Sequence, residues 1–180
     1  MIKNIGNASK ALVVCLFLFV FFSPHHAHSQ GWSHDKIKSL PDSSFALIEV
    51  EKDRNKVRHL PYRDINGGID FDELIYCLGT FSGETWLNPE NKEIARRNLE
   101  EHYYRLRLKQ SKEGIKEPIN INTTPLRDLV RLPNIGPVTA VRIHRFRNAH
   151  GPFQSVEDIK KVEGIGPAIF AGIRYYIKIR

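Results

Sequence analysis

Two short turns in the last third of the chain have residue types that suit the binding of an anion by backbone atoms. The first reads Asn-Ile-Gly-Pro over residues 134–137, and the second reads Gly-Ile-Gly-Pro over residues 164–167. Proline suits the first position of a helix, and glycine lets the backbone come close to a ligand. The start of a helix carries unpaired N–H groups that attract a phosphate. These turns are therefore the candidate binding elements of the chain.

The segments around the two turns repeat each other. A shift of thirty residues places the apolar residues of 126–132 on those of 156–162, and Ile143 on Ile173, without a gap. A repeat of this length with its turn glycines in register indicates one supersecondary unit used twice. Apolar residues spaced by three before each turn, and a proline after it, predict helix, tight hairpin and helix in each copy.

Residues 119–180 resemble the tandem helix-hairpin-helix domain, most closely that of the ComEA family of competence and DNA-uptake proteins. The lead-in at 119–124, the hairpins Leu-Pro-Asn-Ile-Gly and Glu-Gly-Ile-Gly, and the connector at 151–159 are all similar to that family. Asn134 departs from it, because the family has the first glycine of the hairpin there. Asn tolerates the left-handed conformation better than most residues, so we expect the hairpin to be kept.

The resemblance implies a protein that is no enzyme, needs no cofactor and binds double-stranded DNA. Each hairpin would hold one strand, and contacts to phosphates carry little sequence information. Beyond DNA, the implied partner is the DNA-uptake machinery, and no small-molecule substrate is expected. The implied DNA-binding residues are Asn134, Ile135, Gly136, Thr139, Arg142, Lys160, Lys161, Gly164, Ile165, Gly166 and Arg174.

The basic charge of the chain is unevenly distributed. Residues 119–180 hold ten Lys or Arg against four Asp or Glu, a net charge of +6, whereas residues 30–118 hold fifteen against sixteen, a net of −1. A basic module beside a neutral one indicates a polyanionic partner for the module alone.

The N-terminus has the pattern of an export signal over residues 1–29. Lys3 and Lys10 precede an apolar run at 11–22, and Ala27-His28-Ser29 places small residues where a signal peptidase cuts. The apolar run is short for a membrane span, which needs about twenty residues. We therefore expect an exported protein, periplasmic or extracellular; if the segment stays uncleaved, residues 11–22 would anchor it to the membrane.

The remaining residues predict a flexible leader at 30–43, a small α+β domain of no recognised family at 44–110, and a linker at 111–118 before the hairpin domain at 119–180. Within 44–110 we expect a strand at 45–51, a strand or helix at 56–60, and helices at about 70–78 and 89–109. Cys77 lies in an apolar run and is expected in the core. The predicted fold class is mainly α, with a five-helix-type tandem hairpin domain after the α+β domain.

One stretch of this middle segment has the spacing of a calcium-binding loop. Asp64, Asn66, Asp70 and Glu73 fall at ligand positions of an EF-hand. A tyrosine occupies the first ligand position and a proline interrupts the incoming helix. An Asn-Gly-Gly turn that leads into a helix with an acidic first turn is therefore favoured over a metal site.

Two other functions compete with DNA capture. The first is an exported nuclease, in which the middle domain is catalytic, Asp70 and Asp72 hold a metal ion, and the hairpin domain grips the DNA. The second is a structural scaffold that has the double hairpin and binds no DNA. The Gly-Ile-Gly of the second hairpin and the excess of basic charge favour DNA binding over the scaffold.

Overall fold

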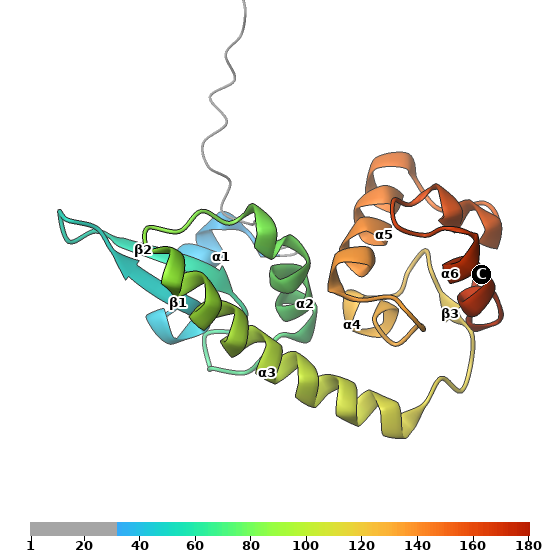
Figure 1. Cartoon of the computed structure of the whole chain (residues 1–180), viewed down its shortest axis with the longest axis horizontal. Helices are drawn as coiled ribbons and strands as arrows, with labels where there is room; N and C mark the ends of the chain where they lie inside the picture. The colour runs from blue at the N-terminus through green and yellow to red at the C-terminus, as the bar shows by residue number, and fades with distance from the viewer. Residues whose placement is uncertain (1–31) are drawn as a thin grey trace, which may run out of the picture.

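The computed structural model describes residues 32–180, which form two units joined by a long helix (Figure 1). The predicted export signal lies outside the described residues. No helix within residues 32–180 is both long and apolar enough to cross a membrane. In chain order the elements are α1 (His34–Ser39), η1 (Asp42–Ser44), β1 (Phe45–Val50), β2 (Lys56–Pro61), α2 (Phe71–Thr80), η2 (Phe81–Gly83), α3 (Pro89–Glu113), β3 (Ile119–Asn120), α4 (Leu126–Leu129), α5 (Pro137–His150), η3 (Val156–Lys161), α6 (Pro167–Ile173), η4 (Arg174–Tyr176) and β4 (Ile177–Lys178).

The N-terminal unit is a β-hairpin covered by helices, which confirms the predicted α+β class. Strands β1 and β2 pair antiparallel, with Phe45 opposite Pro61 and Val50 opposite Lys56. Helices α2 and α3 pack on this hairpin and on each other, and their buried residues include Leu74, Cys77 and Leu99. Cys77 is fully buried and its thiol donates to the carbonyl of Pro61 at 3.2 Å. The prediction that Cys77 is a core residue is confirmed.

The expected flexible leader is wrong for residues 32–43. Helix α1 begins after Ser33, whose side chain accepts a hydrogen bond from the amide of Lys36. Trp32 and Leu40 are buried and pack against Phe45 of β1 in a small separate core. The polar composition of the segment predicted a loop, but its two apolar residues are enough to pin it to the sheet.

Helix α3 is longer than predicted and takes up the first half of the expected linker. It begins at Pro89 with Asn88 as its N-cap, as predicted, and runs to Glu113. It ends at Gly114, which adopts a φ of 65°, a left-handed conformation that glycine takes readily and that commonly ends a helix. Only residues 114–118 therefore remain between α3 and β3.

The C-terminal unit contains five helical segments, α4, α5, η3, α6 and η4, closed by the short parallel pair β3–β4. This confirms the predicted five-helix-type arrangement. The segment before each hairpin is short: α4 has 4 residues, and its counterpart η3 is a 3-10 helix rather than an α-helix. The capping box predicted at Ser155 and Asp158 is present at the start of η3.

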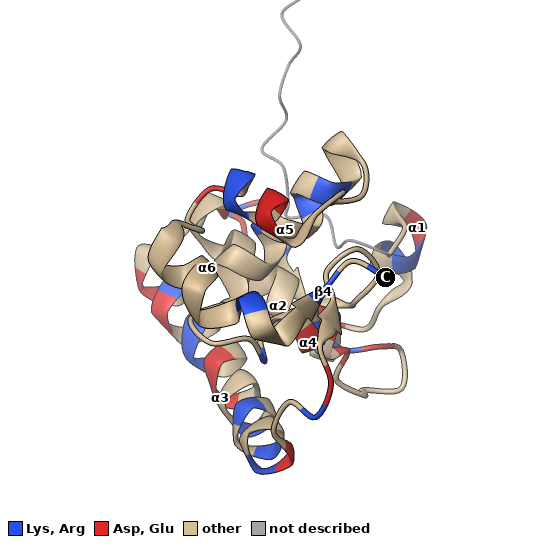
Figure 2. Ribbon diagram, turned by 90° about the vertical axis from the view of Figure 1, so that its right-hand side faces the viewer, with Lys and Arg blue, Asp and Glu red and all other residues tan. Residues whose placement is uncertain are grey.

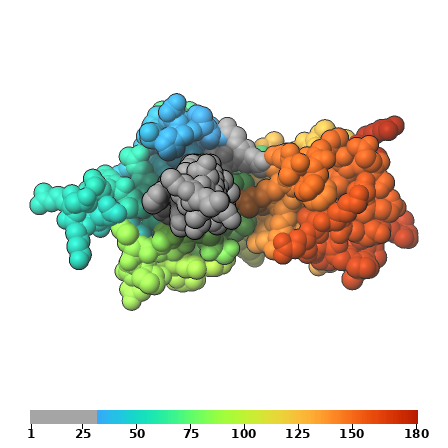
Figure 3. All heavy atoms as spheres, turned by 90° about the horizontal axis from the view of Figure 1, so that it is seen from above, coloured from blue at the N-terminus to red at the C-terminus, as the bar shows by residue number. Residues whose placement is uncertain are grey.

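The two units share one hydrophobic core and lie side by side along the long axis of the molecule (Figure 3). Ile75 and Tyr76 of α2 and Leu106 of α3 belong to the same buried cluster as the apolar residues of α4 and α5. An ion pair of 2.6 Å between Asp72 and Arg127 also joins the units. The sequence analysis treated the units as independent domains, whereas α2 packs on α5 as closely as on α3.

A buried histidine ties the N-terminal unit together. The Nε2 atom of His59 lies 2.8 Å from a carboxylate oxygen of Glu49, and its Nδ1 lies 2.8 Å from one of Glu84. The imidazole stacks on Trp86 with a ring-centroid distance of 4.4 Å. Burial opposes the charged ring, but hydrogen bonds to Glu84 and Glu49 outweigh burial and raise the pKa of His59. The cluster therefore contains an imidazolium held between two carboxylates.

Glu49 completes this cluster and connects it to the start of α3. Burial alone would raise the pKa of Glu49, but amide donors from residues 87 and 88, together with Asn91, lower it to about 2. Each of these donors lies 2.8 to 3.0 Å from the carboxylate. The carboxylate therefore stays ionised throughout the range in which His59 titrates.

We expect the free energy of unfolding to fall as the pH rises above about 6.5, the ordinary pKa of histidine. Because the pKa of His59 is raised in the folded state, its stabilisation is fully present below that value and is lost as the pH rises through the folded pKa. Denaturant unfolding followed by Trp fluorescence at several pH values measures the effect. A folded His59→Gln protein should lose most of this dependence; if it keeps the full slope, another group is responsible.

Candidate nucleic-acid interface

The two hairpins place two helix N-termini without a capping side chain. Helices α5 and α6 begin at Pro137 and Pro167, with Gly136 and Gly166 as their N-caps. No side chain caps either helix, whereas α2 and α3 are capped by Asp70 and Asn88. The first N–H groups of a helix have no partner within it. Those of α5 and α6 are therefore left to a partner from outside the helix.

The positive φ angles of the hairpins occur at Asn134 and Gly164, one position in each copy. Their φ angles are 60° and 90°, and the two residues are related by the thirty-residue repeat. Asn134 therefore does what was expected of it, because it takes the left-handed conformation that glycine takes in the second copy. The turn itself needs special backbone freedom at this position only.

Gly136 and Gly166 do not have the positive φ that the sequence analysis associated with them. Their φ angles are −91° and −82° with extended ψ, a conformation open to any residue. A Cβ atom built at either position would meet nothing within 4 Å. Neither conformation nor packing therefore requires glycine, and what glycine provides at both positions is free access to the backbone.

Ile135 and Ile165 were implied as contact residues, but the structure makes them anchors of the turns. Both side chains are buried in the shared core. Their amides are also occupied, because that of Ile135 donates to the carbonyl of Leu132 and that of Ile165 to the carbonyl of Val162. Neither the side chains nor the amides of these two residues are available to a ligand.

The basic residues implied as phosphate contacts all have partners within the protein. Lys161 lies 2.7 Å from Asp158, and Arg142 lies 3.1 Å from the carboxylate of Glu163. Their cationic groups remain at the surface, as do those of Lys160 and Arg174, whose charges lie over the rings of Phe170 and Tyr175. Thr139 is half-buried in the first turn of α5. Contacts from these groups to DNA would compete with the intramolecular pairs.

The carboxylate of Asp158 is the one most firmly held of these partners. Its hydrogen bond to Lys161, and those from the backbone amides of Ser155 and Gln154, hold its pKa at about 2. It stays ionised at neutral pH and offsets the charge of Lys161. The basic excess of the module is therefore partly neutralised at this position.

Part of the basic excess of the C-terminal unit serves the fold. Arg147 donates to the backbone carbonyls of Ile121 and Thr124, both at 2.8 Å, and Arg127 pairs with the other unit. Along α3, by contrast, Lys and Arg alternate with acidic residues (Figure 2), so that helix offers no surface of a single sign. The net charge of +6 therefore overstates the charge that the module can direct at a polyanion.

The residues of the candidate calcium loop do not converge on one point. A carboxylate oxygen of Asp64 accepts from the amides of Asn66 and Gly68, which closes the turn. Asp70 accepts from the amides of Asp72 and Glu73 and caps α2. Among residues 32–180 no group of three or more metal-binding side chains is gathered. The loop is the turn and acidic helix start that the sequence analysis favoured.

The carboxylates proposed for a nuclease are likewise engaged elsewhere. Asp70 is the N-cap of α2, while Asp72 accepts from both the amide and the guanidinium of Arg127. Burial raises the pKa of Asp72 despite the nearby arginine. This pair holds the two units together and does not form a second ligand beside Asp70.

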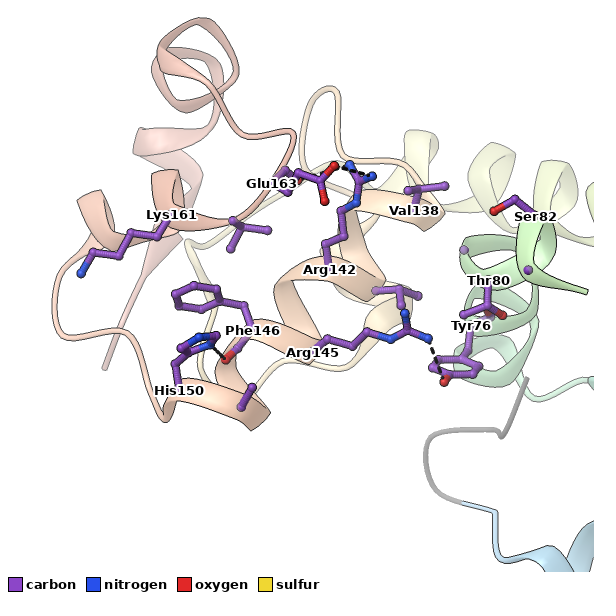
Figure 4. A pocket seen from close by; sticks show the side chains of 15 residues that line it. Tyr76, Thr80, Ser82, Val138, Arg142, Arg145, Phe146, His150, Lys161 and Glu163 are labelled. Carbon is purple, nitrogen blue, oxygen red and sulfur yellow. Dashed lines mark hydrogen bonds and ion pairs between the residues drawn. The ribbon is translucent and has the colours of Figure 1, made fainter. Parts of the chain in front are cut away.

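The structure also reveals a groove that the sequence analysis missed (Figure 4). It has a volume of about 1100 Å³ and lies between α2, α5 and the residues that lead into the second hairpin. Arg145 lies along its floor and was not among the implied site residues. The repeat could have drawn attention to Arg145, since it lies on the exposed side of α5 one turn from Arg142, but its neighbours from α2 depend on tertiary packing.

Comparisons with known proteins agree with this geometry. Residues 114–178 match the model of the helix-hairpin-helix motif. ComE operon protein 1 of Bacillus subtilis (strain 168) is 39% identical over 71 residues, which cover 39% of this chain and 35% of that protein. The endonuclease/exonuclease/phosphatase family domain-containing protein 1 of Danio rerio is 31% identical over 120 residues, 64% of this chain and 22% of that protein. Its Rattus norvegicus counterpart is 39% identical over 59 residues, 33% of this chain and 10% of that protein.

The match to the Danio rerio protein covers more of this chain than the hairpin segment alone, because 64% exceeds the share of residues 114–178. No solved structure matches the chain. The chain spans about a third or less of the length of these relatives. Two uncapped helix starts, a left-handed residue in each turn and the matched segment agree: the C-terminal unit is a tandem helix-hairpin-helix domain, similar in sequence to ComE operon protein 1.

Proposed function

We propose that this protein binds double-stranded DNA without sequence preference, through its two hairpins, and that it is exported and takes part in DNA uptake. The observation that carries the proposal is the pair of glycine N-caps at 136 and 166. The fold requires glycine at neither, yet both leave the N–H groups of a helix start open. Such a site suits a phosphate, because the N–H groups and the positive end of the helix dipole attract an anion.

The role in uptake rests on two further observations. One is the similarity to ComE operon protein 1 and the resemblance to the competence family. The other is the basic and apolar N-terminal sequence, which has the pattern of an export signal. A protein that captures incoming DNA outside the cytoplasm needs affinity for any sequence, and phosphate contacts provide this.

A nuclease is the second candidate, because relatives named for an endonuclease/exonuclease/phosphatase family domain match this chain. Those matches cover 10% and 22% of the relatives, and the proposal for this chain remains DNA binding. In the structure, Asp70 and Asp72 serve as a helix cap and an inter-unit ion pair.

One experiment tests binding and cleavage together. In a gel-shift assay with plasmid and linear duplex DNA, the protein should retard all sequences alike, with or without Mg²⁺ or Ca²⁺, and leave the DNA intact. Affinity should fall with salt, with a slope of log affinity against log salt of about −0.9 per phosphate contact. Absence of any shift at low salt would refute the proposal. Metal-dependent nicking that an Asp70→Ala, Asp72→Ala protein loses would establish the nuclease instead.

A further inference from the structure

The groove between the two units is bordered by elements of both. Its α5 wall runs from Val138, next to the first hairpin, to His150 at the end of the helix, and residues 161–163 line it before the second hairpin (Figure 4). The opposite wall is the end of α2 and the following η2, with Thr80 and Ser82. The groove therefore begins at the hairpins and leads away from them along α5.

The α5 side of the groove carries the positive charge. Arg142, Arg145 and Lys161 line it against a single carboxylate, Glu163, which gives a net charge of +2. Glu163 is already bound by Arg142 at 3.1 Å. Arg145 is exposed, and its partner is neutral, because the guanidinium donates to the hydroxyl of Tyr76 at 3.3 Å. The charge of Arg145 is therefore not offset by an acidic partner among the described residues.

Aromatic rings lie beside these charges. Phe146 lines the groove and stacks on His150 with a ring-centroid distance of 4.3 Å, and His150 is exposed. The guanidinium of Arg145 lies 5.7 Å from the centre of the Tyr76 ring. Basic groups interleaved with flat side chains are the composition that holds unpaired nucleotides, because bases stack on the rings while cations bind the phosphates.

The α2 side of the groove is polar and carries no cation. It is formed by the carboxyl end of α2, where the helix dipole is negative, and by the hydroxyls of Thr80 and Ser82. Phosphates avoid such a wall, whereas base edges can accept hydrogen bonds from hydroxyls and donate to them. The groove is thus suited to a strand with its phosphates toward α5 and its bases toward α2.

From this asymmetry we infer that the groove binds single-stranded DNA that continues from the duplex held at the hairpins. The inference rests on the proposed duplex binding and adds a preferred substrate, a duplex with a single-stranded extension. A closed duplex has its bases paired in the interior and presents only its phosphates, so it leaves the α2 wall unused. An unpaired strand can use both walls.

Fluorescence anisotropy with the whole protein tests this inference. The probes are a blunt duplex, the same duplex with a short single-stranded thymidine extension at its 3′ end or its 5′ end, and the extension alone. We expect one polarity of extension to bind about tenfold more tightly than the blunt duplex, a gain that a single stacked base can provide.

Two variants address the two walls separately. Arg145→Gln removes the unpaired cation of the α5 wall, and Ser82→Asp places a negative charge on the α2 wall at an exposed position. Both should abolish the gain from the extension and leave binding to the blunt duplex within about twofold. Ser82→Asn is the uncharged control for the second, and Arg97→Gln, which removes an exposed charge from α3, is the control for the first.

The possible results separate this inference from the proposed function. If the protein binds the blunt duplex and gains nothing from either extension, the groove holds no single strand, while the duplex function stands. If Arg145→Gln weakens binding to blunt and extended duplexes equally, the groove belongs to the duplex footprint and the inference is overturned. If no probe binds at all, the proposed function itself fails.

Discussion

Replacing Gly136 and Gly166 together with Asp should reduce affinity for duplex DNA by about a hundredfold or more and at the same time raise the stability of the protein slightly. Both glycines are helix N-caps with extended backbone and open space around the missing side chain. Asp is among the preferred N-cap residues and is better than glycine by a few tenths of a kcal/mol. Its carboxylate would accept from the amides that a phosphate would otherwise occupy.

The loss of affinity follows from hydrogen bonds and charge together. Hydrogen bonds to a charged group contribute roughly 1.5–3 kcal/mol each, and each introduced carboxylate also repels the phosphate. A loss of binding is commonly explained by partial unfolding, but here the variant is expected to melt at a temperature equal to or higher than the parent. Binding measured by anisotropy and melting measured by circular dichroism should therefore move in opposite directions.

A matched control adds the same charge away from the hairpins. Asn66→Asp with Thr85→Asp introduces two carboxylates at exposed positions of the N-terminal unit. This protein should bind duplex DNA almost as well as the parent, because only the general electrostatic term changes. If the hairpin variant is folded and binds as tightly as this control, the hairpins are structural turns and the basic helix faces carry the binding.

The hairpin domain was predictable from the sequence because its determinants are local. A tight turn followed by proline specifies its backbone within a few residues, and the copy thirty residues on repeats the specification. The long helix α3 was predictable for the same reason, since Asn88 and Pro89 mark its start. Which glycine of each hairpin takes the positive φ was assigned less well, because a glycine in a sequence does not reveal its φ.

What could not be predicted depends on residues that are distant in the sequence. The burial of Trp32, the pairing of Arg142 with Glu163 and the groove beside Arg145 all arise when helices meet. Composition misled at residues 30–43, where polar residues outnumber the apolar ones that hold the segment in place. The boundary between the units was also misplaced, because a shared core leaves no mark on the local pattern.

Gly79 is the residue on which this shared core depends most closely, and replacing it with Val should uncouple the two units. A Cβ atom at position 79 would lie 2.5 Å from a methyl group of Val141 and 2.8 Å from the carbonyl oxygen of Pro137. The oxygen belongs to the backbone of α5 and cannot move aside alone. We expect α2 to be forced away from α5, with a loss of about 1–3 kcal/mol in the free energy of unfolding, as in other overpacked cores.

The tryptophans make the uncoupling measurable. Trp32 and Trp86 both belong to the N-terminal unit, so Trp fluorescence reports that unit, whereas far-ultraviolet circular dichroism reports the helices of both. In the parent protein the two signals should change together on denaturation, because one core unfolds as a whole. In Gly79→Val protein they should separate into two transitions. Gly83→Val is the control, since a Cβ there meets nothing within 4 Å.

The same substitution should also weaken DNA binding, and the reason lies in where Gly79 makes its contact. Pro137 is the first residue of α5 and directly follows the N-cap Gly136, so a helix pushed off Pro137 disturbs the first hairpin itself. If Gly79→Val protein unfolds in one transition at the midpoint of the parent, the units are not coupled through this contact. If it unfolds in two transitions but binds duplex DNA unchanged, the N-terminal unit stabilises the hairpin domain without positioning its first hairpin.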